Sequence, residues 1–518
     1  MVKNELKKEW IAILDFGSQY TQLIARRIRE FNVYSEIFPY YVDIAELKKK
    51  SPNGIILSGG PDSVLNSNSP TVSKSIFDIN IPILGICYGS QLITKLMDGL
   101  VYKSENAEFG NAKVKICNNK NILFHDFPDE IEVWMSHNDI IKKMPAGFKL
   151  AAVSSDDAIA AIFDEKRDVY GLQFHPEVTH TKMGKDILYN FTHRICKCAG
   201  SWKPKVFIDK TIDYIKKEIG DGKVVAGVSG GVDSMVAAVL THKAIQEKLH
   251  CIFIDTGLMR KNEAEEVKRI FQEFFEIKLY AYDYSKEFLA ALQGINDPEK
   301  KRKIIGNLFI KIFEDKAKRI GNVTHLLQGT LYPDVIESVS INGPSSKIKS
   351  HHNVGGLPEK MELKLLEPLK NLFKDEVRKI GKSLNIPDTI LWRQPFPGPG
   401  LAIRVIGEID FNKLQILREA DEIIKKEILK EGLNRDLWQY FGILLPVKSV
   451  GVMGDLRTYD YSLVLRIVTS YDGMTADWAR LPHILLAKIS NSIINNVKGI
   501  NRILYDISSK PPSTIEWE

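Results

Sequence analysis

Short apolar runs alternate with helical patterns over the first part of the chain. Trp10–Leu14, Gly54–Leu57 and Ile81–Ile86 are continuous apolar runs of strand length, and a turn-forming sequence follows the first two. Between the first and second runs, four apolar residues recur at helical spacing from position 23 to position 31. Buried strands that alternate with amphipathic helices are typical of a parallel α/β sheet.

A second alternating unit begins at Val224–Val228. This apolar run passes through a glycine-rich turn into the helical stretch Ser234–Leu249, and the strand Cys251–Ile254 comes next. The segment Leu331–Met361 loses periodicity and gains Ser, Pro, Gly, Lys and His. A loop of this length inside a compact domain is more often functional than idle.

A third unit follows the turn-rich sequence at residues 394–400. A plausible linker at 199–204 precedes the second unit and follows a predicted helix that carries Cys196 and Cys198. We therefore predict an α/β fold, with two doubly wound, mainly parallel-sheet domains at residues 1–202 and 203–393 and a smaller α+β domain at 394–518. The elements predicted in the third unit are helices at Phe411–Lys430 and near Ile484–Val497, and strands at Gly442–Val452, Tyr461–Thr469 and Ile503–Ile507.

Composition agrees with a multidomain globular protein. The 518 residues suggest about three domains at roughly 150 residues each. A net charge of 71 − 65 = +6 without a basic tail gives no reason to expect nucleic-acid binding. The charged N-terminus does not resemble a signal peptide, and no apolar stretch is long enough to span a membrane. Five cysteines, an odd and sparse set, favour a reducing cytoplasm over a disulfide framework.

The first candidate centre combines a cysteine with a histidine and a glutamate. Cys87 lies between an apolar run and a helical pattern, and a helix N-terminus favours the thiolate. A thiol nucleophile needs a base, and the base needs an orienting group. His175 and Glu177 meet these needs if the backbone is extended, because residues two apart then point the same way. Taken singly, a buried cysteine or a surface His-Pro-Glu sequence is at least as often structural.

The motifs GICYGSQ, FHPEV and SGGP resemble those of class I glutamine amidotransferases. In that family the cysteine forms a glutamyl thioester and ammonia is released. The resemblance covers about residues 10–200 and implies that Cys87 is the nucleophile, His175 its base and Glu177 the orienter. By itself His137 is a poor candidate, since a loop histidine is usually just solvated. The resemblance implies that the oxyanion hole and the glutamine site involve Gly59, Gly60, Tyr88, Gln91, Ser136 and His137.

The second candidate centre is a glycine-rich turn between a strand and a helix. It is not a Walker A loop, because the GxxxxGK[ST] pattern is absent. The string SGGVDS resembles instead the PP-loop of ATP pyrophosphatases, and Asp233 could help to hold Mg²⁺. Asp255–Gly257 would lie near adenosine in a doubly wound sheet, although a turn with a helix cap explains it equally well. The predicted ATP-binding residues are Ser229, Gly230, Gly231, Val232, Asp233, Ser234 and Met235.

From end to end the chain resembles the GMP synthetase family, in its glutamine-hydrolysing form. The carrying segments are DTGLMRKNE, QGTLYPDVIES, KSHHNVGGLP, FPGPGLAIRV, GVMGD and KPPSTIEWE. The resemblance implies that ATP, xanthosine monophosphate (XMP) and glutamine give GMP, AMP, pyrophosphate and glutamate through O2-adenylated XMP. It also implies Mg²⁺ with the ATP, a dimerisation domain at the C-terminus and a homodimer.

The same resemblance assigns substrate contacts that the pattern alone does not. The Leu331–Met361 stretch becomes a lid over ATP, with Lys349, His351 and His352 near phosphates; no Cys or third His accompanies them, so anion contacts are preferred over a metal. The terminal segment would otherwise be predicted as a frayed end. The implied XMP-binding residues are Arg260, Pro397, Gly398, Lys510, Ile515 and Glu516.

Three other functions compete with this interpretation. A tRNA-thiolating PP-loop enzyme needs reactive cysteines near the loop, and Cys251 lies in the middle of a predicted strand. A catalytically inactive sensor would tolerate a damaged triad or PP-loop, and both are intact. Amidation of another acceptor, as in NAD or asparagine synthesis, would keep both centres and change only the substrate.

Overall fold

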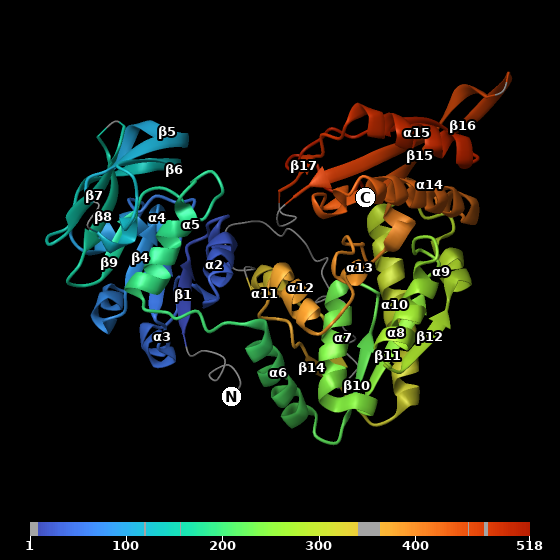
Figure 1. The fold of residues 1–518 in the computed structure, drawn as a ribbon, viewed down its shortest axis with the longest axis horizontal. Coiled ribbons are helices and arrows are strands. Elements are labelled where there is room, and N and C mark those ends of the chain that lie inside the picture. The colour runs from blue at the N-terminus through green and yellow to red at the C-terminus, as the bar shows by residue number, and fades with distance from the viewer. Residues whose placement is uncertain (1–8, 119–120, 156, 340–362, 454, 471–474) are drawn as a thin grey trace. The chain divides into compact units, whose positions relative to one another are not determined.

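The fold is described from a computed structural model, which covers residues 9–518 except 119–120, 156, 340–362, 454 and 471–474. The contacts divide the chain into two compact units, of which the first extends to Lys210 and the second begins at Thr211. Figure 1 shows the elements of each unit in chain order from blue to red.

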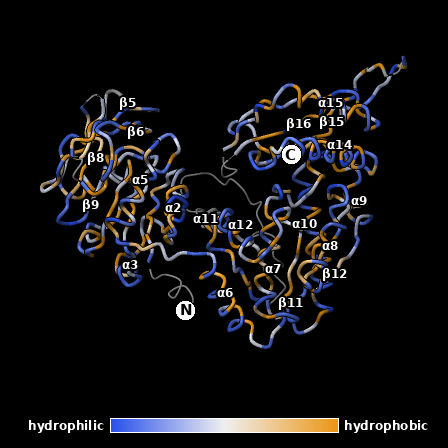
Figure 2. The backbone as a smooth tube through the Cα atoms, viewed as in Figure 1, coloured by the Kyte–Doolittle hydropathy of each residue, from blue (hydrophilic) through white to orange (hydrophobic). Residues whose placement is uncertain are grey.

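A nine-stranded sheet in the order β2-β1-β3-β4-β9-β8-β7-β5-β6 forms the first unit. Its first five strands pair in parallel, and the remaining four pair antiparallel. The buried strands β8 and β9 are among its hydrophobic segments (Figure 2). The strands are β1 (Trp10–Asp15), β2 (Tyr34–Pro39), β3 (Gly54–Leu57), β4 (Ile83–Ile86), β5 (Leu100–Ile116), β6 (Glu130–Lys143), β7 (Lys149–Ser154), β8 (Ile159–Asp164) and β9 (Val169–Leu172).

Helices cover this sheet and carry the chain between its parallel strands. On α2, Ile24 and Ile28 of the predicted apolar stripe are buried, whereas Leu23 is only half-buried. Arg27 and Arg29 are buried too, although the helical spacing of apolar residues places them outside the stripe. The helices are α2 (Thr21–Glu30), α3 (Ile44–Lys50), α4 (Tyr88–Leu96) and α5 (Gly184–Tyr189), with a π-helical turn at Asn190–Ile195.

The second unit contains an all-parallel sheet in the order β12-β11-β10-β13-β14. Successive strands extend outward from β10 in both directions, so the crevice where the order reverses lies at the carboxyl end of β10. The strands are β10 (Lys223–Gly227), β11 (Leu249–Asp255), β12 (Leu279–Asp283), β13 (Val323–Leu327) and β14 (Lys364–Leu366). The helices are α6 (Pro204–Ile219), α7 (Val232–Ile245), α8 (Glu263–Phe274), α9 (Ser285–Leu292), α10 (Pro298–Ile320), α11 (Tyr332–Val339), α12 (Lys374–Ser383) and α13 (Asp388–Leu391).

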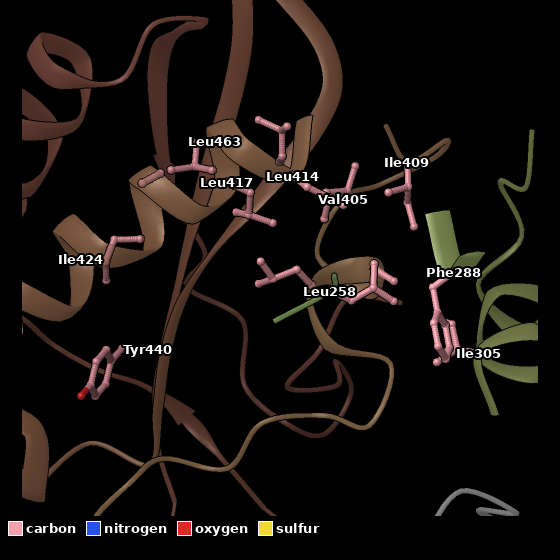
Figure 3. Packing of buried hydrophobic residues seen from close by; sticks show 14 of the residues in the cluster. Leu258, Phe288, Ile305, Val405, Ile409, Leu414, Leu417, Ile424, Tyr440 and Leu463 are labelled. Carbon is pink, nitrogen blue, oxygen red and sulfur yellow. The ribbon is translucent and has the colours of Figure 1, made fainter. Parts of the chain in front are cut away.

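The last part of the second unit is a small sheet with two long helices. Strands β15 (Gln439–Met453), β16 (Leu456–Thr469) and β17 (Asp477–Trp478) pair antiparallel, and β18 (Ile500–Tyr505) pairs in parallel with β16. Helices α14 (Phe411–Lys430) and α15 (His483–Asn496) pack against this sheet. One apolar cluster continues from Leu258 and Phe288 of the parallel-sheet part to Leu417 and Leu463 (Figure 3).

The predicted elements are confirmed for the most part, and two expectations are wrong. The bounds predicted for Gly54–Leu57 and Phe411–Lys430 agree with β3 and α14. Residues Tyr332–Val339, predicted to be aperiodic, form α11, in which Tyr332 is buried and Val335, one turn further on, is half-buried. Cys196 and Cys198 both lie beyond the helical segment predicted to carry them, which ends at Ile195. The rest of the predicted loop, from residue 340 to 361, lies outside the described residues.

Candidate active sites

Cys87 occupies the sharp turn between β4 and α4. Its backbone adopts φ 51° and ψ −106°, a strained conformation for a residue with a Cβ atom. The helix comes close to the sheet here, since a Cβ on Gly89 would lie 2.3 Å from the Leu57 carbonyl oxygen. Cys87 is buried at the N-terminus of α4, where the helix dipole favours an anion. The backbone thus holds the sulfur in one fixed position.

His175 and Glu177 meet in the turn that follows β9. The imidazole Nδ1 lies 2.7 Å from Glu177 Oε1, and the Glu177 side chain is fully buried. The contact itself is as predicted, but the backbone at Pro176–Glu177 is a turn rather than an extended strand. Thr181 fixes this turn by donating its hydroxyl to the His175 carbonyl oxygen at 2.6 Å.

The environment of His175 favours its protonated form. Burial by itself lowers the pKa of His175, but the Glu177 carboxylate and the Cys87 side chain outweigh burial, and the pKa is raised well above its usual range. The Cys87 thiol donates to the Ser136 carbonyl oxygen at 3.6 Å, and Gln173 Nε2 donates to the sulfur at 3.9 Å. These contacts describe a thiol beside an imidazole that a buried carboxylate orients, the arrangement needed for nucleophilic catalysis.

Two glycines let the backbone pass close to the turn that carries Cys87 and to His175. A Cβ on Gly60 would lie 2.8 Å from the Phe16 carbonyl oxygen, and one on Gly59 would lie 3.1 Å from His175 Cε1. Tyr88 is the first residue of α4, so its N–H has no partner within the helix. Backbone N–H groups in this position can stabilise a tetrahedral oxyanion.

The residues expected to hold glutamine lie on buried secondary structure. Gln91 of α4 donates from Nε2 to the Asp139 carbonyl oxygen at 2.9 Å. Ser136 and His137 lie on β6, and His137 is only 5% exposed, so the expectation of a solvated loop histidine is wrong. Its Nε2 lies 3.2 Å from Glu108 Oε2, and this contact lowers the pKa of Glu108. Sequence reasoning missed Glu108, because no short motif links β5 to β6.

The predicted PP-loop lies between β10 and α7, at the switch point of the parallel sheet. Gly230 has φ 76°, and a Cβ there would lie 2.5 Å from Val267 Cγ2. Gly231 is the N-cap of α7, and the Ser234 hydroxyl donates to its carbonyl oxygen at 3.0 Å, which closes the turn near Ser229. The residues Val232 and Met235 are buried, and therefore only their backbone could reach a ligand.

Charged side chains from distant segments meet the PP-loop. Lys374 Nζ lies 2.7 Å from Asp233 Oδ2, while the buried Asp233 Oδ1 has no partner among the described residues. Arg393 donates to the Gly230 carbonyl oxygen at 2.9 Å and pairs with Glu266 at 2.6 Å. The sequence analysis found neither Lys374 nor Arg393, because both lie far from the loop in the chain and outside recognisable motifs.

The predicted nucleotide-substrate residues fall into two groups. Arg260 is buried, with Nε 3.0 Å from Asp421 Oδ2, and burial lowers the pKa of its guanidinium. Arg260 and Arg404 both lie over the Phe396 ring, at 4.6 and 5.2 Å from its centroid, next to the turn at Pro397 and Gly398.

The other predicted nucleotide-substrate residues belong to the C-terminal segment. Glu516 makes two hydrogen bonds with Arg404, at 2.7 and 3.0 Å, while Ile515 packs against an apolar cluster that contains Phe441. Lys510 pairs through its backbone with Ala476. The candidate lid residues Lys349, His351 and His352 lie outside the described residues.

The described part of the chain also bears on two further features, a metal site and a membrane-spanning helix. Within the described residues, no cluster of three or more His, Cys, Asp or Glu side chains has the arrangement of a metal site. No helix in the same part of the chain combines the length and hydrophobicity that membrane crossing requires.

Fold and sites together define a glutamine amidotransferase joined to a PP-loop synthetase. Family models match accordingly: "Glutamine amidotransferase class-I" at residues 12–195, "NAD synthase" at 206–312 and "GMP synthase C terminal domain" at 426–517. The chain is 55% identical to the GMP synthase [glutamine-hydrolyzing] of Aquifex aeolicus (strain VF5), over 99% of this chain and all of that protein. The proteins of the same name from Halothermothrix orenii (strain H 168) and Clostridium botulinum (strain Kyoto) are 55% and 52% identical, with equal coverage. The chain belongs to the glutamine-hydrolysing GMP synthase family.

The Glu177→Gln substitution tests the electrostatics of the buried pair. Burial lowers the pKa of His175, and the Glu177 carboxylate raises it. Because the substitution removes that carboxylate, we expect the pKa of His175 to fall. Titration of the imidazole resonances by ¹⁵N NMR measures this change. In the surface variant Glu165→Gln, the wild-type carboxylate pairs with exposed Lys149, and the substitution should leave the pKa of His175 unchanged. An unchanged pKa in Glu177→Gln would contradict the assignment of Glu177 as the controlling charge.

Proposed function

We propose that the chain makes GMP from XMP at two chemical centres, one around Cys87 and one at the PP-loop around Asp233. Glutamine-dependent, ATP-driven GMP synthesis is the activity of the family to which it belongs. The observation that carries the assignment of residues is the combination of an intact Cys87–His175–Glu177 constellation with an intact PP-loop in one chain. The first centre supplies ammonia, and the second supplies the leaving group that ammonia displaces.

At the first centre, the Cys87 thiolate attacks the amide carbon of glutamine while His175 holds the thiol proton. The developing oxyanion accepts hydrogen bonds from the N–H groups of Gly60 and Tyr88. His175 then gives its proton to the departing nitrogen, and ammonia leaves behind a glutamyl thioester. Water, activated by His175, hydrolyses the thioester to glutamate and restores the thiol. Glu177 keeps the imidazole oriented through all of these steps.

The other glutamine contacts follow from the walls of this site. Gln91, Ser136 and His137 bind the glutamine substrate, with Gly59 beside the imidazole. The half-buried Glu108 beside His137 supports this role, because its carboxylate lies 3.2 Å from Nε2 and leaves Nδ1, which has no partner among the described residues, for the substrate.

At the second centre, the xanthine O2 of XMP attacks the α-phosphorus of ATP and pyrophosphate departs. Backbone N–H groups of Ser229–Ser234 and the N-terminus of α7 bind the pyrophosphate portion. Mg²⁺ would be held by the free Asp233 Oδ1 together with phosphate oxygens, and it supplies charge neutralisation for the leaving group. Ammonia then attacks C2 of the adenylated base and AMP leaves, giving GMP. Lys349, His351 and His352 complete the phosphate contacts as a lid.

The acceptor is assigned to XMP through the C-terminal part of the chain. The match to an NAD synthase model ends at residue 312 and reflects the PP-loop part alone, so it gives no reason to prefer another acceptor. Arg260, Pro397, Gly398, Lys510, Ile515 and Glu516 form the proposed XMP site. The guanidiniums of Arg260 and of the fully buried Arg404 lie over Phe396 and support this assignment, because they place positive charge and planar groups beside the turn at Pro397 and Gly398.

The proposed organisation has three domains and two copies of the chain. We assign residues 1–202 to glutamine hydrolysis, 203–393 to ATP cleavage and 394–518 to XMP binding and dimerisation, in a cytoplasmic enzyme. An unusual concentration of exposed apolar side chains on the β15–β16 hairpin supports a second copy as partner. These side chains are Val447, Val450, Val452, Leu456 and Tyr459, which are 45–75% exposed.

Cys87→Ala should abolish GMP synthesis from glutamine and leave synthesis from ammonium salts intact. Loss of the nucleophile is expected to reduce the glutamine-dependent rate by at least about 10³-fold. A coupled assay with Mg-ATP and XMP, run with each nitrogen source, measures both rates. Cys117→Ala, at an exposed cysteine, is the matched control and should retain both activities. Glutamine hydrolysis at the wild-type rate in Cys87→Ala would refute the assignment.

Asp233→Ala should abolish adenylation with either nitrogen source, because it removes the oxygen ligand proposed for Mg²⁺. We expect a loss of at least about 100-fold. The measurement is ATP–pyrophosphate exchange in the presence of XMP. Asp209→Ala, at an exposed position on α6, should exchange at the wild-type rate. Retained exchange in a folded Asp233→Ala protein would show that the aspartate has another role.

Val452→Glu should convert the dimer to monomers. A two-fold interface brings the new carboxylate into an apolar contact on both copies, so the desolvation cost is incurred twice. Sedimentation equilibrium of both proteins over a range of concentrations measures the change. Leu65→Glu, at an exposed apolar residue of the first unit, should remain dimeric. A wild-type chain that sediments as a monomer would overturn the proposed homodimer.

A further inference from the structure

The C-terminal segment is held by buried positive charges. Lys301, Arg404 and Arg466 are fully buried, and each pairs with an acidic side chain of residues 506–518. The partners are Glu518, Glu516 and Asp506, in that order. The frayed end that the sequence pattern predicts is therefore absent, because an ordered set of ion pairs anchors this segment.

Lys301 and Glu518 form the ion pair at the last residue of this segment. Lys301 Nζ lies 2.5 Å from Glu518 Oε2 and donates to the carbonyl oxygens of Ala402 and Val405 at 3.2 and 2.9 Å. The other carboxylate oxygen of Glu518 accepts the Gly407 N–H at 3.3 Å. Glu518 thus joins α10, which carries Lys301, to the backbone turn that contains Arg404.

The contacts of Arg404 and Arg466 hold the residues proposed to bind XMP. Arg404 binds the carboxylate of Glu516 with two nitrogens, and it lies over the Phe441 ring at 3.7 Å from the centroid. Arg466 donates to the carbonyl oxygens of Thr514 and Ile515 at 2.9 and 3.3 Å. Ile515 and Glu516 are therefore bound on one side by Arg466 and Arg404 and on the other by the Glu518 anchor.

Because these pairs are buried, the loss of either partner is costly in free energy. A charge removed from water costs several kcal/mol unless a partner compensates it, and loss of one partner leaves the other charge uncompensated. Burial lowers the pKa of Lys301, while Glu518 opposes this shift. If Glu518 lost its charge, the Lys301 ammonium group would need hydration. The turn from Ala402 to Gly407 would then have to open to let water reach it.

We propose that Lys301 and Glu518 are positioning residues for XMP, which act by fixing the segment that carries Ile515 and Glu516. Neither residue contacts the reacting atoms. The inference rests on the proposed assignment of Ile515 and Glu516 to the XMP site. It adds that affinity for XMP depends on an ion pair two residues beyond that site, between the C-terminal segment and α10.

Steady-state kinetics of Glu518→Gln, with ammonium salts as the nitrogen source, test this proposal. Ammonium makes the measurement independent of Cys87. We expect the KM for XMP to rise about tenfold or more, while the KM values for ATP and ammonium change less than about twofold. Lys301→Met should show the same selective rise. The double variant Lys301→Met/Glu518→Gln, which removes both charges, should recover most of the affinity for XMP.

A solvent-exposed ion pair in the same helix provides the control. Asp315→Asn, which removes the carboxylate that pairs with exposed Arg319 and also contacts Lys316, should leave all three KM values unchanged. If Glu518→Gln does not fold, Glu518→Asp replaces it, because the shorter side chain cannot reach Lys301 and the Gly407 N–H together.

Each outcome decides one question. A lower melting temperature of the variants with an unchanged KM for XMP would reduce the pair to a structural role and overturn the inference. A double variant no better than the single variants would also overturn it. Failure of the wild-type chain to convert XMP with ammonium would refute the proposed function itself, and that result is separate from any effect of the variants.

Discussion

The close approach of a helix N-terminus to the carboxyl end of a buried parallel strand constrains both chemical centres. At Cys87 the turn between β4 and α4 is so tight that Gly89 lies against the backbone of β3, and no larger residue fits. At the PP-loop, Gly230 contacts α8, and Gly329 approaches the backbone of Asp233, where a Cβ would lie 3.1 Å away. The same geometry serves two purposes, since partial positive charge at a helix N-terminus favours a thiolate in one case and phosphates in the other.

Local sequence was sufficient for the elements and for the turns that carry both centres. Continuous apolar runs located β1, β3, β10 and β11, and helical spacing located α14 to the residue. The prediction of a thiol, a base and an orienter rested on residue chemistry, and His175 and Glu177 are in contact although the backbone between them is a turn. The types of the two side chains thus indicated that His175 and Glu177 interact, although the extended backbone assumed for them was wrong.

What the sequence did not reveal depends on contacts between distant segments. Lys374 reaches Asp233 from a helix 141 residues further along the chain, and Lys301 reaches Glu518 across 217 residues. No periodicity encodes such pairings, because each requires the complete sheet to bring the two segments together. The buried state of His137 escaped notice for the same reason, since the strand β6 is buried only after β5 pairs with it.

The two centres solve opposite electrostatic problems. At the first, a buried anion and an adjacent imidazole form a compact pair, and glutamine brings no net charge that must be neutralised. At the PP-loop, the proposed site for polyanionic substrates, the Asp233 carboxylate would repel an arriving phosphate. Lys374 pairs with Asp233 and offsets its charge, and Arg393, which pairs with Glu266, lies at the Gly230 carbonyl oxygen. In the C-terminal part, buried arginines and Lys301 are compensated by the terminal acids, and the cost of burying those cations is offset only while the segment is docked. The net charge of +6 is therefore a poor guide to function, because charges that compensate one another in pairs do not show in it.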